Sequence, residues 1–234
     1  MIQFDKFELD NGLKVIVHQD TSTPMAVVNV LYNVGAKDED PQKTGFAHLF
    51  EHLMFGGSIN IPIYDEPLQR AGGENNAYTT NDLTNYYCQI PAENIETAFW
   101  LESDRMLSLA FSEKSLEVQR KVVCEEFKEH YINKPYGDAW HKMRNLAYTK
   151  HPYQWMTIGA SLEHVEQAKM LDVKDFFFTF YRPNNAILVV TGNVTTEQVK
   201  QLAEKWFGPI PAGEKYNRNL PVEPKQTTPR FLQV

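Results

Sequence analysis

A five-residue stretch, His48-Leu49-Phe50-Glu51-His52, combines residue types at a spacing that suits metal chemistry. On a helix, residues four apart lie one turn apart and differ by about 40° in azimuth, so both imidazoles can bind one ion. Glu51 lies about 60° to the other side of His48, where its carboxylate can reach a water molecule beside that ion. This order, with the carboxylate directly before the second histidine, is typical of one class of zinc hydrolases.

A catalytic zinc site takes three protein ligands and keeps one coordination position open. Zinc lowers the pKa of water towards 7, and a neighbouring carboxylate accepts the released proton as a general base. We therefore expect one Zn²⁺ per chain, with His48 and His52 as two of its ligands and Glu51 as the base. Because histidine pairs at this spacing also occur on helices that bind no metal, a third ligand is needed to decide.

The candidates for the third ligand lie on one predicted helix, for which Ser112 is a suitable N-cap. Glu126 shares a face of this helix with Val122 and Val123, and we expect that face to turn towards the core. A carboxylate that faces a core is costly unless it is paired or coordinated, so the pattern favours Glu126, with an ion pair to a nearby cation as the alternative. The other side chains of suitable chemistry on this helix are Cys124, Glu125, Glu129 and His130.

The chain resembles the pitrilysin superfamily of zinc peptidases, which includes insulysin and the mitochondrial processing peptidase. In that family the His-x-x-Glu-His motif is followed, about 74 to 76 positions after its second histidine, by the ligand glutamate of a helix rich in paired glutamates. Here the position 74 residues after His52 is Glu126, in the pair Glu125-Glu126. The resemblance continues in order through residues 72–79, 84–87, 133–137, 151–153, 158–159, 181–183 and 192–194.

For this chain the resemblance implies a zinc-dependent metalloendopeptidase that hydrolyses peptides or unfolded protein segments. It assigns zinc binding to His48, His52 and Glu126, and proton transfer to Glu51. The sequence departs from the family at Gln119, seven residues before Glu126, where many members carry a further glutamate that helps to order the site. Gln119 keeps a hydrogen-bond acceptor without the charge, which leaves its effect on the rate open.

The resemblance also assigns substrate binding and partners. Asn76 and Ala77 are expected on an edge strand beside the zinc, where the backbone adds a peptide substrate as an extra strand. Family members usually carry two or more copies of this domain, which enclose the substrate like a clamshell, and one copy binds the metal. This sequence of 234 residues holds a single copy, so we expect a second homologous half, in cis or in trans, or self-association.

The elements that must position these residues indicate an α+β fold, and the resemblance implies a mostly antiparallel sheet with helices packed on one face. Asn11-Gly12 between two β-rich runs predicts a hairpin, because this pair supplies the positive φ angles of a tight turn. Further β-rich runs cover residues 26–32, two pieces within 76–89, and 186–190. Apolar residues at helical spacing predict helices over 46–53, 94–109, 112–131, 139–148, 161–168, 173–181 and 195–208.

The chain divides near residue 208. Residues 1–208 are predicted to form the zinc metallopeptidase domain. Residues 209–234 are rich in proline and polar residues, which indicates a linker, and the last four resemble the start of a strand in a missing or separate second half.

Composition narrows the functional class. Lys and Arg number 23 against 30 Asp and Glu, a net charge of −7, so neither nucleic acid nor an anionic membrane is expected as a partner. No apolar run of about 18 residues is present and no signal peptide is visible, so we expect a cytoplasmic protein. The two cysteines, Cys88 and Cys124, cannot form a four-cysteine zinc site.

Three alternatives remain open. The same fold occurs as a non-catalytic subunit, although such chains usually lose several of the residues retained here. A small-molecule hydrolase or lyase can use the same motif with a cysteine ligand, but Cys124 lies about 200° from Glu126 on the helix, so only one of them can face the ion. A structural zinc domain would leave Glu51 without a role.

Overall fold

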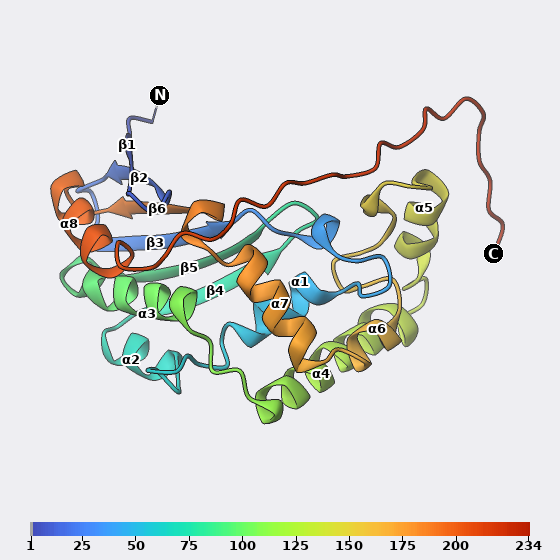
Figure 1. Cartoon of the computed structure of the whole chain (residues 1–234), viewed down its shortest axis with the longest axis horizontal. Coiled ribbons are helices and arrows are strands. Elements are labelled where there is room, and N and C mark those ends of the chain that lie inside the picture. Colours follow the sequence, from blue (N-terminus) through green and yellow to red (C-terminus); the bar gives the residue numbers. More distant parts are fainter. Residues whose placement is uncertain (1) are drawn as a thin grey trace.

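A computed structural model that describes residues 2–234 shows the protein as one sheet with helices packed against it (Figure 1). The strands are β1 (Asp5–Glu8), β2 (Lys14–Gln19), β3 (Met25–Tyr32), β4 (Glu74–Thr79), β5 (Thr84–Pro91) and β6 (Ala186–Gly192). The α-helices are α1 (Phe46–Leu53), α2 (Asp65–Arg70), α3 (Ile95–Leu107), α4 (Glu113–Phe127), α5 (Ala139–Ala147), α6 (Leu162–Glu166), α7 (Met170–Phe180) and α8 (Thr196–Trp206). A π-helical turn, Lys128–Ile132, continues α4, and short 3₁₀ turns lie at Ala36–Asp38, Ala92–Asn94, Pro152–Gln154 and Pro183–Asn185. In the described part of the chain, no helix has the length and apolar character needed to cross a membrane.

The strands form one open sheet in the order β1-β2-β6-β3-β5-β4. Every neighbouring pair is antiparallel except β2 with β6, which are parallel. The predicted hairpin joins β1 to β2, and Gly12 has the positive φ of 83° that the turn requires. These features confirm the α+β fold with a mostly antiparallel sheet.

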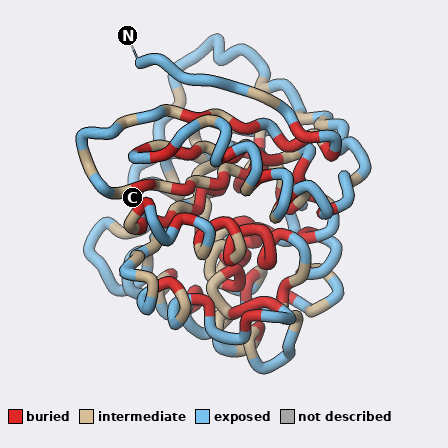
Figure 2. Tube along the Cα trace, turned by 90° about the vertical axis from the view of Figure 1, so that its left-hand side faces the viewer, coloured by how far each residue is buried: buried red, intermediate tan, exposed pale blue. Residues whose placement is uncertain are grey.

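One face of the sheet carries the core. Along β3, Ala26, Val28 and Val30 are buried while the residues between them are half-buried, as the period of two dictates. α3 packs against β3 and β5, and α8 packs against β2. The buried stretches accordingly lie in the interior, and the exposed stretches lie at the periphery (Figure 2). The expected placement of helices on one face is thus confirmed.

Aromatic packing holds the short helix α1 in place. Its helical stripe is buried, as predicted, and α1 contacts α4, α7 and β4. The Phe50 ring lies 4.9 Å from that of Tyr181 and 6.1 Å from that of Phe177, measured between centroids. The residues that α1 buries are Phe46, Ala47, Leu49, Phe50 and Leu53.

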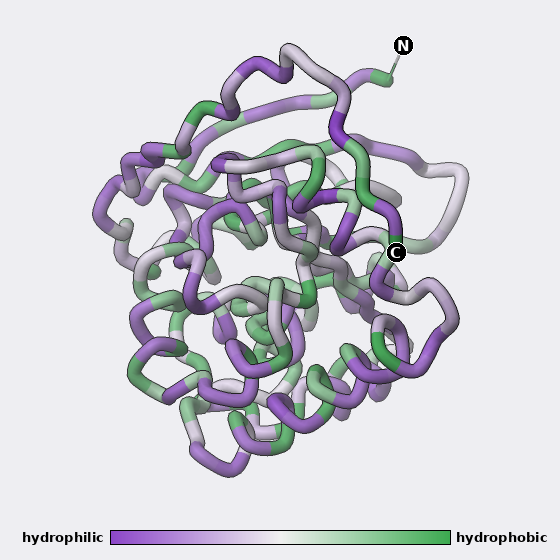
Figure 3. Tube along the Cα trace, turned by 90° about the vertical axis from the view of Figure 1, so that its right-hand side faces the viewer, coloured by the Kyte–Doolittle hydropathy of each residue, from purple (hydrophilic) through white to green (hydrophobic). Residues whose placement is uncertain are grey.

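Ser112 is the N-cap of α4, as predicted: its side chain accepts a hydrogen bond from the backbone N–H of Ser115. Its core face is set by Leu116, Val123, Cys124 and Phe127. Val122 is 39% exposed, so the prediction that Glu126 faces the core together with Val122 and Val123 is wrong. Glu126 lies at the boundary of the buried face, and its side chain is 35% exposed. Hydrophilic and hydrophobic residues alternate along the helices in Figure 3, as expected for helices with one buried and one exposed face.

Residues 209–234 contain no helix or strand. That the last four residues begin a strand of a second half stays a prediction. The segment is nevertheless attached to the domain along its length, beginning with two hydrogen bonds between Gly213 and Asn184. Arg218 pairs with Asp38, and Arg230 donates to the last carbonyls of α5. The Glu223 carboxylate accepts hydrogen bonds from three consecutive backbone N–H groups that follow α5. The division of the chain near residue 208 stays a prediction.

Substitution of Phe50 by alanine should destabilise the fold strongly, because the ring is fully buried against Phe177 and Tyr181 and its loss leaves a cavity. Such changes cost about 3–5 kcal/mol of unfolding free energy, measurable by urea denaturation. Leu171→Ala on α7 is a suitable control, since its side chain is 69% exposed and the change should stay within about 0.5 kcal/mol. A loss below about 1 kcal/mol in Phe50→Ala would contradict this account of the packing.

Candidate metal centre

Two helices that are distant in sequence bring three side chains together. His48 and His52 project from successive turns of α1, and Glu126 projects from α4, which α1 contacts. The Nε2 atoms of His48 and His52 lie 3.6 and 3.5 Å from the same Glu126 oxygen, Oε2. The ligand atoms of all three residues lie within 4.8 Å of one another. Ligand atoms around a tetrahedral zinc are ~3.3–3.5 Å apart, so the two distances to Glu126 already suit that geometry.

The two imidazoles have the properties of metal ligands. Burial, together with a smaller effect of the neighbouring His52, lowers the pKa of His48 to about 4. His48 is therefore uncharged at neutral pH, so its approach to Glu126 is not an ion pair. The two rings stand perpendicular, with centroids 4.8 Å apart, and both present Nε2 to the carboxylate. Two neutral imidazoles and one carboxylate are a donor set that zinc accepts.

One side of the cluster is accessible. The side chains of His48, His52 and Glu126 are 18%, 21% and 35% exposed. A catalytic zinc needs an open position for water or substrate, whereas a structural zinc is enclosed by four protein ligands. The partial exposure therefore favours a catalytic over a structural site.

Glu51 faces the end of β4. Its Oε2 accepts a hydrogen bond from the hydroxyl of Thr79, the last residue of that strand. Burial raises the pKa of Glu51, while the hydrogen bond from Thr79 acts in the opposite direction. A raised pKa brings a carboxylate closer to the range in which a general base works best. Sequence analysis missed Thr79; the period-two pattern of the strand, which places it on the same face as the half-buried Ala77, is the signal that could have identified it.

β4 is an edge strand, which is the position expected for Asn76 and Ala77. It pairs with β5 on one side only. Asn76 is exposed, and its Oδ1 accepts a hydrogen bond from the backbone N–H of Ala77. Where β4 turns into β5, the Thr80 N–H donates to the Leu83 carbonyl. N–H groups alternate between the two sides of an antiparallel strand, so that of Ala77, three residues earlier, points away from β5 to the open edge. The role of this pair in substrate binding stays a prediction.

The other sequence candidates do not join the cluster. Cys124 is buried in the core face of α4, so the structure gives no support to a cysteine ligand. Gln119 is half-buried and precedes Glu126 by seven residues, which places it two turns away on the same side of α4. The remaining candidates are exposed: Glu125, Glu129 and His130.

An α+β domain with this helix-borne cluster defines a class of metallopeptidase domain, and comparisons with known proteins give the family. Residues 14–159 match the insulinase family, peptidase family M16, and residues 169–233 match the peptidase M16 inactive domain. The chain belongs to peptidase family M16, which confirms the resemblance seen in the sequence.

The chain is similar to proteins of this family from bacteria and mitochondria. It is 35% identical to the zinc protease PqqE of Helicobacter pylori over 202 residues, which cover 85% of this chain and 45% of that protein. It is 27% identical to the beta subunit of the mitochondrial-processing peptidase of Saccharomyces cerevisiae over 210 residues, or 88% and 45% of the two chains. A crystal structure of a protease from Helicobacter pylori matches with a TM-score of 0.90 and 32% identity, covering 98% of this chain and 56% of that one. The chain spans about half the length of the curated relatives it matches.

His52→Ala should abolish zinc binding without unfolding the protein, because it removes one of three ligands from a partly exposed position. Elemental analysis of the purified parent should give about one zinc per chain, and the variant should give almost none. His130→Ala is the matched control, since that histidine is exposed just beyond the end of α4. Full zinc occupancy in a folded His52→Ala variant would rule out this ligand.

Proposed function

We propose that the chain is the metal-binding half of a zinc-dependent metalloendopeptidase that acts on peptides or unfolded protein segments. The observation that carries the proposal is the convergence of His48, His52 and Glu126 beside Glu51, in a chain of family M16. A zinc ion held by the three ligands would supply Lewis-acid activation of water and of the peptide carbonyl.

Glu51 is the general base in this proposal. Its carboxylate accepts a proton from the attacking water and then delivers it to the leaving amine of the cleaved peptide bond. The hydrogen bond from Thr79 fixes one carboxylate oxygen and leaves the other available for the proton. His48 and His52 take no part in proton transfer, because their Nε2 atoms are directed to the metal position.

The open edge of β4 is the proposed substrate site. A peptide bound there as an additional strand makes main-chain hydrogen bonds, which explains how one enzyme accepts many sequences. Ala77 offers its N–H at this edge once Asn76 releases it. The cytoplasmic location expected from the sequence stays a prediction.

Glu51→Gln should keep zinc but lose hydrolysis, because glutamine has the same size and cannot accept the proton. A general base contributes typically about 10²–10⁴-fold, so turnover of a quenched fluorescent peptide should fall by at least about 100-fold. Glu125→Gln is the control, since that side chain is 72% exposed and pairs only with Lys128 on the outer side of α4. Turnover within a few-fold of the parent would exclude Glu51 as the base.

We further propose that a second half-domain, supplied in cis or in trans or by self-association, completes the substrate site. The support is that the chain spans 45% of each curated relative described above. Orientation of a substrate contributes roughly 7–11 kcal/mol in well-arranged systems, and one half alone provides only one wall.

The isolated chain should therefore bind zinc but cleave peptides at least about 100-fold more slowly than a full-length relative. The measurement is peptide turnover by the chain alone and after addition of the downstream half of the Helicobacter pylori relative, with a chelator as control. Rapid turnover by the chain alone, as a monomer, would contradict the need for a second half. Zinc binding without turnover even in the completed assembly would favour a non-catalytic subunit.

A further inference from the structure

The helix that carries both histidines has no cap of its own. Its N-cap is Gly45, which adopts a left-handed conformation with φ of 89° and offers no side chain. The first N–H groups of a helix have no partner within the helix and need acceptors from elsewhere. Glu39 supplies them: its Oε2 accepts from the N–H of Gly45 at 3.0 Å, and its Oε1 accepts from the N–H of Ala47 at 2.8 Å.

A carboxylate is the group that this position requires. Glu39 is 7% exposed, and a third donor, the indole Nε1 of Trp155, lies 3.1 Å from its Oε2. Three donors meet two oxygens that only accept, and the negative charge lies at the positive end of the helix dipole. Burial raises the pKa of Glu39 to about 8 even though the three hydrogen bonds lower it. All three partners are donors, so a protonated oxygen would find no acceptor among residues 2–234, and the geometry of the site fits the ionised carboxylate. A glutamine here would direct its NH₂ group at one of the donors and leave it unsatisfied.

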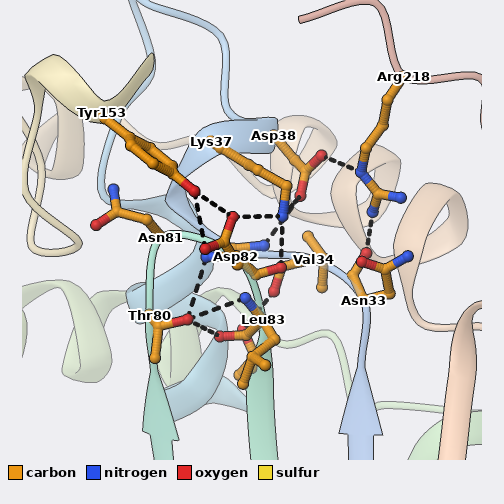
Figure 4. A network of polar contacts seen from close by, with 12 residues as sticks. Asn33, Val34, Lys37, Asp38, Thr80, Asn81, Asp82, Leu83, Tyr153 and Arg218 are labelled. Carbon is orange, nitrogen blue, oxygen red and sulfur yellow. Dashed lines mark hydrogen bonds and ion pairs between the residues drawn. The ribbon is translucent and has the colours of Figure 1, made fainter. Parts of the chain in front are cut away.

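Glu39 is itself held in place by the turn between β4 and β5. The 3₁₀ turn Ala36–Asp38 immediately precedes it, and backbone N–H groups of this turn donate to the carbonyls of Thr80 and Asn81. Lys37 pairs with Asp82, as shown with the neighbouring polar contacts in Figure 4. The turn that follows Thr79, the hydrogen-bond partner of Glu51, therefore also fixes the residues that lead into Glu39.

The position of the His48 ring depends on the backbone of the first turn of α1, which Glu39 binds. A metal-binding histidine usually donates its second ring nitrogen to a carboxylate or carbonyl, which orients the ring. The Nδ1 atom of His48 is buried and finds no hydrogen-bond partner within residues 2–234. The ring is therefore placed by its backbone, and the preceding residue, Ala47, is one of the two whose N–H groups Glu39 binds.

We propose that Glu39 is a positioning residue of the metal site, whose buried carboxylate fixes the first turn of α1 and thereby the metal-binding nitrogen of His48. The inference rests on the proposed zinc site for its effect on metal. Its effect on the helix, however, does not require metal and can be measured separately.

The test compares Glu39→Gln with the parent. Zinc affinity, measured by competition with a chromophoric chelator, should fall about tenfold or more, and the visible absorption of the Co²⁺-loaded protein should shift. In the metal-free protein, the amide protons of residues 45–48 should exchange about tenfold faster. The control is Asn11→Ala, which removes a buried side chain that donates to the carbonyls of Phe207 and Ile210, near the end of α8. It should lower the melting temperature while leaving zinc affinity, the Co²⁺ spectrum and exchange in α1 unchanged.

The outcomes separate this inference from the proposed function. A parent that binds no zinc would refute the zinc site, while the exchange of α1 amides would still decide the role of Glu39. Unchanged affinity, spectrum and exchange in folded Glu39→Gln would overturn the inference. If that variant does not fold, Trp155→Phe removes one donor from Glu39 and keeps an aromatic ring. It should change the Co²⁺ spectrum and the exchange of α1 in the same direction, and parent-like values in this variant would equally overturn the inference.

Discussion

The candidate metal centre depends on one packing contact, that of α1 against α4. Two of the proposed ligands lie on α1 and the third lies on α4, 74 residues beyond His52. The distance from Glu126 to the histidines is therefore set by the packing of the two helices rather than by either helix alone. Functional geometry of this kind tolerates errors of only about 0.5 Å. Close-packed side chains meet that demand because an interior at crystal-like density yields little to displacement. The rings of Phe50, Phe177 and Tyr181 provide such packing behind the ligands.

A buried ion pair adds a second constraint on the sheet side. Arg105 of α3 donates from two nitrogens to the Glu102 carboxylate, and its guanidinium lies 4.5 Å from the ring centroids of Tyr64 and Tyr86. Such a pair contributes little net stability, because desolvation opposes the attraction, but its directional contacts link α3 to the aromatic rings beside it. Because Tyr86 belongs to β5, these contacts fix α3 against the strand that pairs with β4. The placement of Thr79 beside Glu51 follows from that register.

Sequence alone predicted those parts of the molecule that short-range rules govern. Asn11-Gly12 marks a turn because of backbone sterics, and Ser112 marks a helix start through a hydrogen bond three residues away. On α4, apolar residues occur at both 122 and 123, so local pattern cannot decide which of them faces the core. Only the packing against α1 and α6 shows that Val123 is buried and Val122 is not.

Contacts between segments distant in the sequence were not predicted, because local sequence patterns carry no information about them. Glu39 contacts α1 from just after a 3₁₀ turn, Thr79 contacts it from a strand end, and no spacing rule links either residue to the helix. The insertion of β6 between β2 and β3 is equally non-local, since strand order depends on the whole chain.

The metal and the peptide of the proposed enzyme make different demands, and the proposal assigns these demands to different elements of the fold. A metal ion needs ligands fixed to fractions of an ångström, and these come from two packed helices whose backbone groups bond internally. A peptide of variable sequence needs a row of main-chain donors and acceptors, and the outer edge of β4 provides one. Proteins usually protect such edges with lysine, proline or a covering segment. The sequence of β4, Glu74-Asn75-Asn76-Ala77-Tyr78-Thr79, contains neither lysine nor proline. Apart from Glu74 at its start, β4 carries no charged side chain, and this composition supports the proposal that its edge accepts an added strand beside the proposed ligands on α1.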